Sequence, residues 1–379
     1  MAEWQTVRLG TIVSTNQNTY SPKENWQFVN YLDTGNITMN RVDEIQCINI
    51  LTDKLPSRAR RKVKSNSIIY STVRPNQLHY GIIKEQPENF LVSTGFAVID
   101  VDFKKAVPDY IYYALTQQEV TEHLQAIAEQ SVSAYPSIKP SDIENLELLL
   151  PDKNTQGKIV SILKSIDEKI KQNNEINNNL EQQADALYQT FFSPKSGTQG
   201  KVVTLDEYCS IFTGKKNATA SVNGGKYKFF TCAPEALQID SYIFDGNAII
   251  VSGNGAYTGR TRFYSGKFDL YQRTYACTLL DNVNPDFIFP LYWFVKLELS
   301  KKIMGGTRGS AIPYIVMNDL AKFEFIYNEE MFANYTPLFK SLTEAIQSNE
   351  FESENLAQIR DSLLPKLMSG ELDVFNIDL

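Results

Sequence analysis

The sequence predicts a mixed α/β (α+β) fold with two similar globular domains, each followed by a long helix. Three observations carry this prediction: an internal repeat, a heptad pattern in both copies of the repeat, and short strand-like runs ahead of each heptad pattern. The chain has 379 residues, of which 42% are apolar, so it exceeds one ordinary domain. The expected segments are a first domain, a first helix, a second domain, and a second helix with a tail: 1–152, 153–193, 194–332 and 333–379.

The repeat has an offset of about 177 residues, close to half of the chain. Residues 108–112 match 285–289, and residues 133–138 match 310–315, both at an offset of 177. The strand-like run 67–71 aligns with 248–252 at an offset of 181. A period this long indicates duplicated domains and not a solenoid.

Each predicted helix carries a heptad seam. Residues 159–193 align without gaps to 335–369, with 11 identities in 35 positions. Core positions recur at alternating steps of four and three in both copies, which is typical of a coiled coil. The expected core residues are Ile159, Leu163, Ile166, Ile170, Asn173, Asn177, Leu180 and Leu187 in the first helix, and Phe339, Leu342, Ile346, Asn349, Ser353, Leu356 and Leu363 in the second.

Both seams become polar at the same central layers. Amides buried in a coiled coil fix its register by pairing with one another. An antiparallel pair would join Asn173 to Ser353 and Asn177 to Asn349, whereas a parallel pair would join Asn173 to Asn349. The residues themselves fit both directions.

Local clusters of Lys and Arg stand out in a chain whose net charge is −7. The net charge excludes a uniformly basic nucleic-acid binder, but residues 54–84 contain no acid, and two stretches of the second half are similar. Lys and Arg neutralise phosphates, and Asn, Gln and Arg can pair with base edges. The candidate DNA-binding residues are Lys54, Arg58, Arg60, Arg61, Lys62, Lys64, Arg74, Asn76 and Gln77 in the first half, and Lys215, Lys216, Lys226, Lys228, Asn254, Tyr257, Thr258, Arg260, Arg262 and Arg308 in the second.

The sequence shows no catalytic or metal-binding constellation. It has two histidines, and its four cysteines lie far apart, so no zinc-site spacing is present. No nucleophile elbow and no nucleotide-binding loop in its proper context is found. The longest apolar run, 287–295, is much shorter than the roughly 20 residues that span a bilayer. We therefore expect a cytoplasmic, reduced protein that binds no metal and catalyses no reaction.

In the order of these features the chain resembles the specificity subunits of type I restriction–modification enzymes. The resemblance rests on residues 67–71 and 246–252, then on 141–143 and 318–320, and finally on 150–151 and the helix segment 156–170. It implies two target-recognition domains, one for each half of a bipartite double-stranded DNA target, and an antiparallel helix pair with pseudo-twofold symmetry. It further implies that the helices dock two modification subunits. S-adenosylmethionine, ATP and Mg²⁺ would be bound only by those subunits and by a restriction subunit.

Two other interpretations compete with this one. A stand-alone DNA methyltransferase or nuclease would need a catalytic motif that the sequence lacks. A non-catalytic scaffold that carries two domains on a coiled-coil spacer, and that does not bind DNA, would explain the repeat. That scaffold would leave the cations of residues 54–74 without a role.

Overall fold

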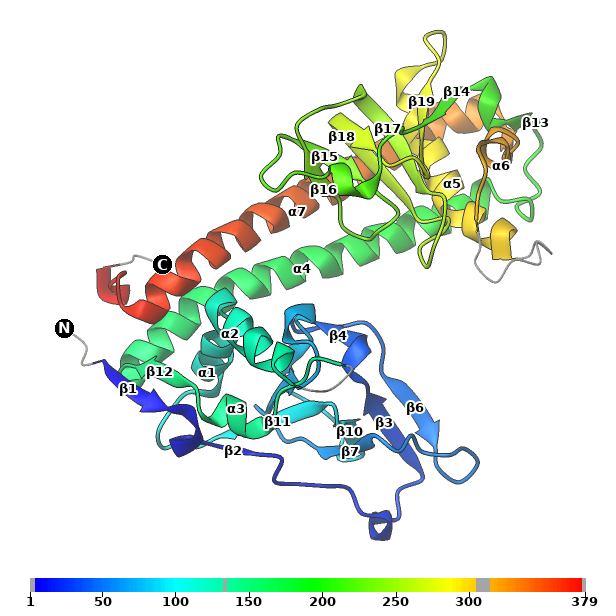
Figure 1. The fold of residues 1–379 in the computed structure, drawn as a ribbon. Helices are drawn as coiled ribbons and strands as arrows, with labels where there is room; N and C mark the ends of the chain where they lie inside the picture. The colour runs from blue at the N-terminus through cyan, green and yellow to red at the C-terminus, as the bar shows by residue number, and fades with distance from the viewer. Residues whose placement is uncertain (1–3, 132–134, 305–313, 377–379) are drawn as a thin grey trace. The chain divides into compact units, whose positions relative to one another are not determined.

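The computed structural model describes residues 4–131, 135–304 and 314–376 (Figure 1). The chain forms two compact units. Unit 1 extends to Ile170 and resumes at Glu354, whereas unit 2 contains Lys171–Ser353. Each unit therefore includes one part of each long helix, α4 (Lys153–Phe191) and α7 (Glu329–Ser369).

Unit 1 contains two four-stranded sheets, with strand orders β6-β3-β10-β7 and β2-β11-β8-β9. A third pairing joins β1 to β12, so the start of the domain lies against the strand that leads into α4. A small hairpin joins β4 to β5. The strands are β1 (Gln5–Arg8), β2 (Val13–Thr15), β3 (Phe28–Leu32), β4 (Ile37–Thr38), β5 (Arg41–Val42), β6 (Gln46–Asn49), β7 (Ala59–Lys62), β8 (Ile68–Ser71), β9 (Tyr80–Ile82), β10 (Phe90–Ser93), β11 (Phe96–Val101) and β12 (Glu147–Leu150).

The main core of unit 1 lies between the sheet β2-β11-β8-β9 and the helices of the unit. Every residue of β11 is buried, as expected for a strand covered on both faces. Helix α1 (Pro108–Leu115) begins at a proline, which fits the first helical turn because that turn needs no N–H donor. With α2 (Gln118–Glu129) and α3 (Pro140–Glu144) it covers the sheet and contacts the unit 1 parts of α4 and α7.

Unit 2 has one six-stranded sheet, in the order β14-β19-β17-β18-β15-β16, and a two-stranded pairing of β13 with β20. Helix α5 (Ile288–Met304) packs against this sheet, and the short α6 (Met317–Ala321) precedes β20. The strands are β13 (Lys201–Thr204), β14 (Cys209–Thr213), β15 (Tyr227–Phe230), β16 (Leu237–Ile239), β17 (Phe244–Ser252), β18 (Thr261–Leu270), β19 (Thr274–Leu279) and β20 (Glu324–Tyr327).

The sheets of each unit contain an equivalent central hairpin. In unit 2 it is formed by the long strands β17 and β18, and β18 also runs parallel to β15. In unit 1 each of the two long strands is replaced by two shorter ones: β8 pairs with β9, β7 pairs with β10, and β10 runs parallel to β3. The interruption lies at Asn66, whose positive φ of 68° turns the chain between β7 and β8.

The two long helices run antiparallel within each unit. In unit 1 the Arg360 guanidinium lies 2.8 Å from the Asp167 carboxylate. In unit 2 the Asn349 amide donates to Asn177 at 2.8 Å, and the Asn173 amide donates to the Ser353 hydroxyl at 3.2 Å. These are the partners that antiparallel pairing predicts, so the structure selects between the two directions that the sequence allowed.

Candidate nucleic-acid interface

The central hairpin of each unit ends in an eight-residue loop. Residues 72–79 connect β8 to β9, and residues 253–260 connect β17 to β18, so both loops begin and end at an offset of 181. In unit 1 the Ile138 amide donates to the Thr72 carbonyl, and in unit 2 the Ile315 amide donates to the Gly253 carbonyl, both at 2.8 Å. These two hydrogen bonds are equivalent in the repeat, so the loops occupy the same place in the fold.

The loop of unit 1 exposes three candidate base-reading side chains, those of Arg74, Asn76 and Gln77. A single 3-10 turn, Pro75–Gln77, lies between two left-handed residues, Arg74 and Leu78. Non-glycine residues pay a conformational free energy to adopt this backbone, and such strained residues are found most often at functional sites. The main-chain amide of Asn76 is held by the side chain of Gln125 at 3.2 Å.

The loop of unit 2 exposes Tyr257 and Arg260. Asn254 and Thr258 are half-buried, and the Thr258 hydroxyl donates to the Gly255 carbonyl at 2.7 Å. That hydrogen bond closes the turn, so the donor of Thr258 is used within the loop. The exposed side chains with polar groups for an external contact in this loop are those of Tyr257 and Arg260.

The cationic segment of unit 1, residues 54–64, includes strand β7 and the turn that follows it, and two of its lysines have acidic partners. The Lys62 ammonium lies 2.6 Å from the Glu24 carboxylate and over the Trp26 ring. The hydrogen bond from Lys62 lowers the pKa of Glu24 below its ordinary value. Lys64 lies 3.4 Å from the buried Asp100. Their charges are therefore partly neutralised within unit 1.

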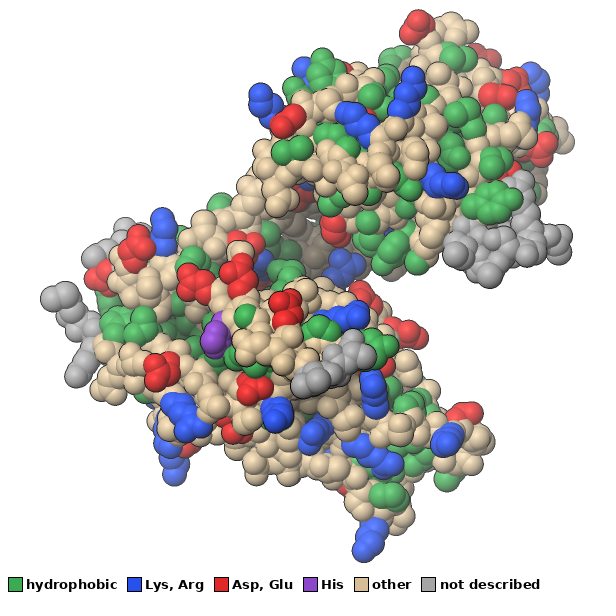
Figure 2. Space-filling view, in the orientation of Figure 1, with side chains coloured by type: hydrophobic (Ala, Val, Ile, Leu, Met, Phe, Trp, Pro, Cys, Tyr) green, Lys and Arg blue, Asp and Glu red, His purple; other side chains and the backbone are tan. Residues whose placement is uncertain are grey.

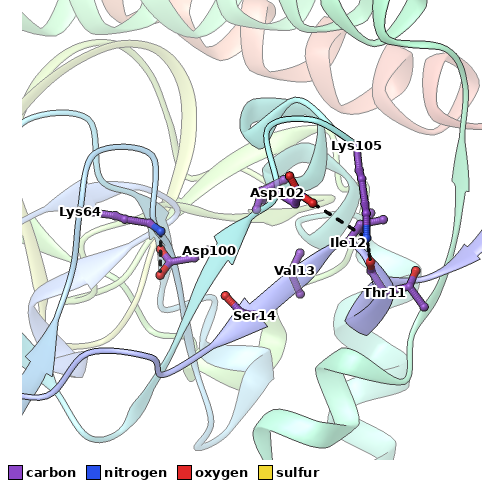
Figure 3. A pocket seen from close by; sticks show the side chains of 9 residues that line it. Thr11, Ile12, Val13, Ser14, Lys64, Asp100, Asp102 and Lys105 are labelled. Atoms are coloured by element: carbon purple, nitrogen blue, oxygen red, sulfur yellow. Dashed lines mark hydrogen bonds and ion pairs between the residues drawn. The ribbon is translucent and has the colours of Figure 1, made fainter.

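Lys64 and Asp100 line a pocket of about 340 Å³ beside β2 and β11 (Figure 3). Asp100 also accepts a hydrogen bond from the Ser67 hydroxyl at 2.6 Å. On the other side of the pocket, the Lys105 ammonium donates to the Thr11 carbonyl at 2.8 Å. Each lysine in this pocket thus already has a partner from the protein.

Four further cations of this segment differ in exposure. Lys54 and Arg58 are exposed, whereas Arg60 and Arg61 are half-buried. Burial lowers the pKa of Arg61, and its Nε has no hydrogen-bond partner among the described residues. On the face shown in Figure 2, Lys and Arg side chains are interspersed with acidic and uncharged polar groups on each unit. The cations are thus distributed over the surface and do not form one continuous basic face there.

In unit 2 the candidate cations likewise differ in exposure, and some have acidic partners. Lys215 and Lys226 are exposed, and Lys228 is half-buried. The Lys216 ammonium lies 2.6 Å from the fully buried Asp269, which also accepts a hydrogen bond from the Ser241 hydroxyl at 2.9 Å.

Arg262 is also held within the fold. Its guanidinium donates to the Ala233 carbonyl and lies over the Phe230 ring, and burial lowers its pKa. Lys216 and Arg262 therefore have structural partners in the free protein. Arg308 lies outside the described residues.

The expected coiled-coil core residues all lie at buried or half-buried positions. The buried ones are Ile159, Leu163, Asn173, Asn177, Phe339, Leu342 and Ile346, and the half-buried ones are Ile166, Ile170, Leu180, Leu187, Asn349, Ser353, Leu356 and Leu363. Helix α7 begins at Glu329, four residues before the boundary expected at 333.

Sequence reasoning missed two groups of residues. One is Tyr135, whose ring lies 5.4 Å from the Arg74 guanidinium carbon. The only available signal was its place in the repeated segment 133–138. The other is a charged layer of the coiled coil, in which Asp167 contacts both Arg360 and Tyr113 of α1. It was missed because these three residues are distant from one another in sequence.

Within the described ranges, no helix is long and apolar enough to cross a membrane. The same residues contain no cluster of three or more His, Cys, Asp or Glu side chains that could hold a metal ion.

Comparison with known proteins places the chain in a family. The model of the type I restriction modification DNA specificity domain matches it twice, over residues 1–182 and 199–327. The HindI specificity subunit of Haemophilus influenzae is 30% identical over 224 residues, which are 59% of this chain and 48% of that protein. The EcoDI specificity subunit of Escherichia coli is 34% identical over 177 residues, which are 45% of this chain and 38% of that protein. The matched regions thus span about half or less of these curated relatives.

One solved structure supports the fold over nearly the whole length. The crystal structure of a type I restriction–modification S subunit from M. genitalium superposes with a TM-score of 0.58 at 17% identity, covering 97% of this chain and 96% of that one. At this identity the similarity shows the fold alone. Since the family model covers most of the sequence in two successive matches, the chain belongs to the family of type I restriction–modification DNA specificity domains.

Proposed function

We propose that the chain is a DNA-specificity subunit that reads a bipartite target, with one unit for each half-site. The observation that supports this most strongly is the pair of equivalent loops, 72–79 and 253–260, held by equivalent main-chain hydrogen bonds. Each loop exposes an arginine, the side chain best suited to bidentate contact with guanine. In this proposal Arg74, Asn76 and Gln77 read one half-site. The loop residues Asn254, Tyr257, Thr258 and Arg260 lie against the other half-site.

The exposed cations outside the loops contact phosphates in this proposal. Lys54, Arg58, Lys215 and Lys226 have the required charge and exposure. Such contacts orient the duplex and carry no sequence information. Lys216 and Arg262 contribute less, since their charged groups are already held by Asp269 and by the Ala233 carbonyl.

The chain itself is non-catalytic in this proposal and acts within a larger complex. Its helices α4 and α7 dock two modification subunits, which bind S-adenosylmethionine and methylate the target. A restriction subunit supplies cleavage with ATP and Mg²⁺. Support comes from the family membership and from the long helices on which both units are built.

Target selection from a random duplex library tests the reading residues. Arg74→Ala should relax the preference at one half-site, and Arg260→Ala at the other, by roughly 1–3 kcal/mol for each lost bidentate contact. Lys104→Ala is a suitable control, because Lys104 is exposed but lies outside both loops. Equal binding of all duplexes by the unmodified protein in its complex, at several salt concentrations, would contradict the proposed function.

The helix pair is proposed to set the spacer between the half-sites. A heptad inserted after Asn177 and another after Ser348 would lengthen both helices by about 10 Å and keep the Asn177–Asn349 pair together. The selected target should then retain both half-sites with about three more base pairs between them. An unchanged spacer with both half-sites still bound would exclude this role of the helices.

A further inference from the structure

The exposed arginine of each recognition loop lies over a tyrosine ring. In unit 1 the guanidinium carbon of Arg74 is 5.4 Å from the ring centre of Tyr135, and in unit 2 that of Arg260 is 5.8 Å from the ring centre of Tyr257. Both rings are exposed, at 61% for Tyr135 and 46% for Tyr257. Neither ring belongs to a hydrophobic core cluster of the described residues.

The two units place the arginine over its ring by different routes. Tyr135 comes from a second segment, which is joined to the loop by the hydrogen bond from the Arg74 amide to the Pro136 carbonyl at 2.9 Å. Tyr257 belongs to the same turn as its arginine, since the Arg260 amide donates to the Tyr257 carbonyl at 3.0 Å. In both cases a main-chain hydrogen bond fixes the arginine backbone next to its aromatic partner.

Stacking limits the freedom of a long side chain and leaves its N–H groups available. A guanidinium is planar, so an aromatic face supports it while the donors at its edge stay open to a ligand. An arginine held in this way loses less conformational entropy when it makes two parallel hydrogen bonds.

Arg262 shows the alternative. It also lies over an aromatic ring, that of Phe230, but its guanidinium donates to the Ala233 carbonyl and its Nε is buried. The two exposed arginines thus lie over exposed rings, and the arginine that is tied into the fold lies over a core ring.

We propose that Tyr135 and Tyr257 are positioning residues that hold Arg74 and Arg260 ready to read a guanine in the major groove, one in each half-site. This inference rests on the proposed function. It adds a role for two aromatic side chains that do not themselves read a base. The ligand chemistry is the O6 and N7 acceptor pair of guanine, which matches the donor fork of arginine.

The test compares Tyr135→Leu with Tyr135→Phe in the assembled complex, with binding measured on the selected target and on duplexes changed at one base pair. Tyr135→Leu should reduce discrimination at a guanine of the first half-site by about threefold to tenfold, with unchanged binding to unrelated DNA. Tyr135→Phe keeps the ring and should restore discrimination. The pair Tyr257→Leu and Tyr257→Phe should give the same result in the second half-site only.

The outcomes separate this inference from the function on which it rests. A complex without sequence preference would overturn both. If Arg74→Ala abolishes discrimination at one base but Tyr135→Leu does not change it, the inference alone is wrong. If Tyr135→Phe and Tyr135→Leu lose discrimination equally, the effect comes from the hydroxyl, and the inference is again wrong. An equal loss on all duplexes would reduce Tyr135 to a structural role.

Discussion

The same layer of the helix pair is charged in unit 1 and neutral in unit 2. In the ungapped alignment of the helices, Asp167 corresponds to Thr343 and Arg360 to Ala184. In unit 1, Asp167 accepts hydrogen bonds from Arg360 at 2.8 Å and from Tyr113 on α1 at 2.6 Å.

The neutral layer of unit 2 uses the same helix position for a different partner. Thr343 accepts a hydrogen bond from the indole of Trp293 on α5 at 2.9 Å, and Ala184 is fully buried in the same hydrophobic cluster as Trp293. In both units this position anchors the globular domain to the long helix. The comparison shows that the repeat preserves the anchoring position while the chemistry of the anchor has diverged.

The two anchors respond differently to loss of one partner. Burial disfavours the charged form of Arg360, but its hydrogen bonds to Asp167 and Asp361 outweigh that effect and raise its pKa. A half-buried cation that loses its main partner is costly, whereas an apolar layer loses mainly packing. The predictions below test this difference.

The largest effect is expected for Trp293→Ala. Trp293 is fully buried in the core of unit 2, so its truncation should lower the free energy of unfolding of that unit by about 3–5 kcal/mol. Urea denaturation followed by circular dichroism would measure the loss. Trp293→Phe, which retains most of the apolar volume, should lose less; equal losses in the two variants would contradict a packing role.

Asp167→Ala should have the next largest effect, at about 2–3 kcal/mol in unit 1, because it leaves the Arg360 guanidinium half-buried with Asp361 as its one carboxylate partner among the described residues. Thr343→Ala at the equivalent position of unit 2 is the matched comparison and should lose less, since no charge is left behind. A greater loss for Thr343→Ala would reverse the comparison.

A combined replacement sharpens the comparison further. Asp167→Thr with Arg360→Ala would give unit 1 the side chains that the equivalent layer of unit 2 carries. The double variant should be more stable than Asp167→Thr alone by about 1 kcal/mol or more, because both charges are removed together. A double-mutant cycle with Arg360→Ala gives the coupling energy, and a coupling near zero would show that the two groups act independently.

The smallest effect is expected for Tyr113→Phe. It removes one hydroxyl that donates to Asp167 and keeps the ring in the core, so the loss should be about 1 kcal/mol. Thermal unfolding at neutral pH would detect it. Adding Tyr113→Phe to Asp167→Ala should have almost no further effect, and a fully additive loss would place the role of Tyr113 outside this hydrogen bond.

Much of the architecture follows from local sequence patterns. The repeat offset of 181 placed two loops at equivalent strand ends, and the polar seam residues identified the layers in which Asn177 meets Asn349. These features depend on spacing, which a sequence shows directly. The direction of helix pairing did not follow from spacing, because both directions align polar residues with each other.

The availability of individual cations could not be predicted, because their partners are distant in sequence. Lys62 is paired with Glu24, 38 residues away, and Lys216 with Asp269, 53 residues away. A segment without acids therefore overstates the number of cations available to a ligand. The position of Arg74 over the Tyr135 ring could not be predicted for the same reason.

The hydrogen bonds that hold the two equivalent loops join main-chain atoms, from Ile138 to Thr72 and from Ile315 to Gly253. These two bonds do not depend on which side chains the exposed loop positions carry, whereas Gly253 is constrained, because a Cβ there would lie 2.5 Å from the Arg273 carbonyl. The loops 72–79 and 253–260 accordingly share no identical residue at any of their aligned positions, although they have the same length. The exposed side chains of either loop can therefore change while these two hydrogen bonds stay intact. Under the proposed function, each half of the target would then change independently of the other.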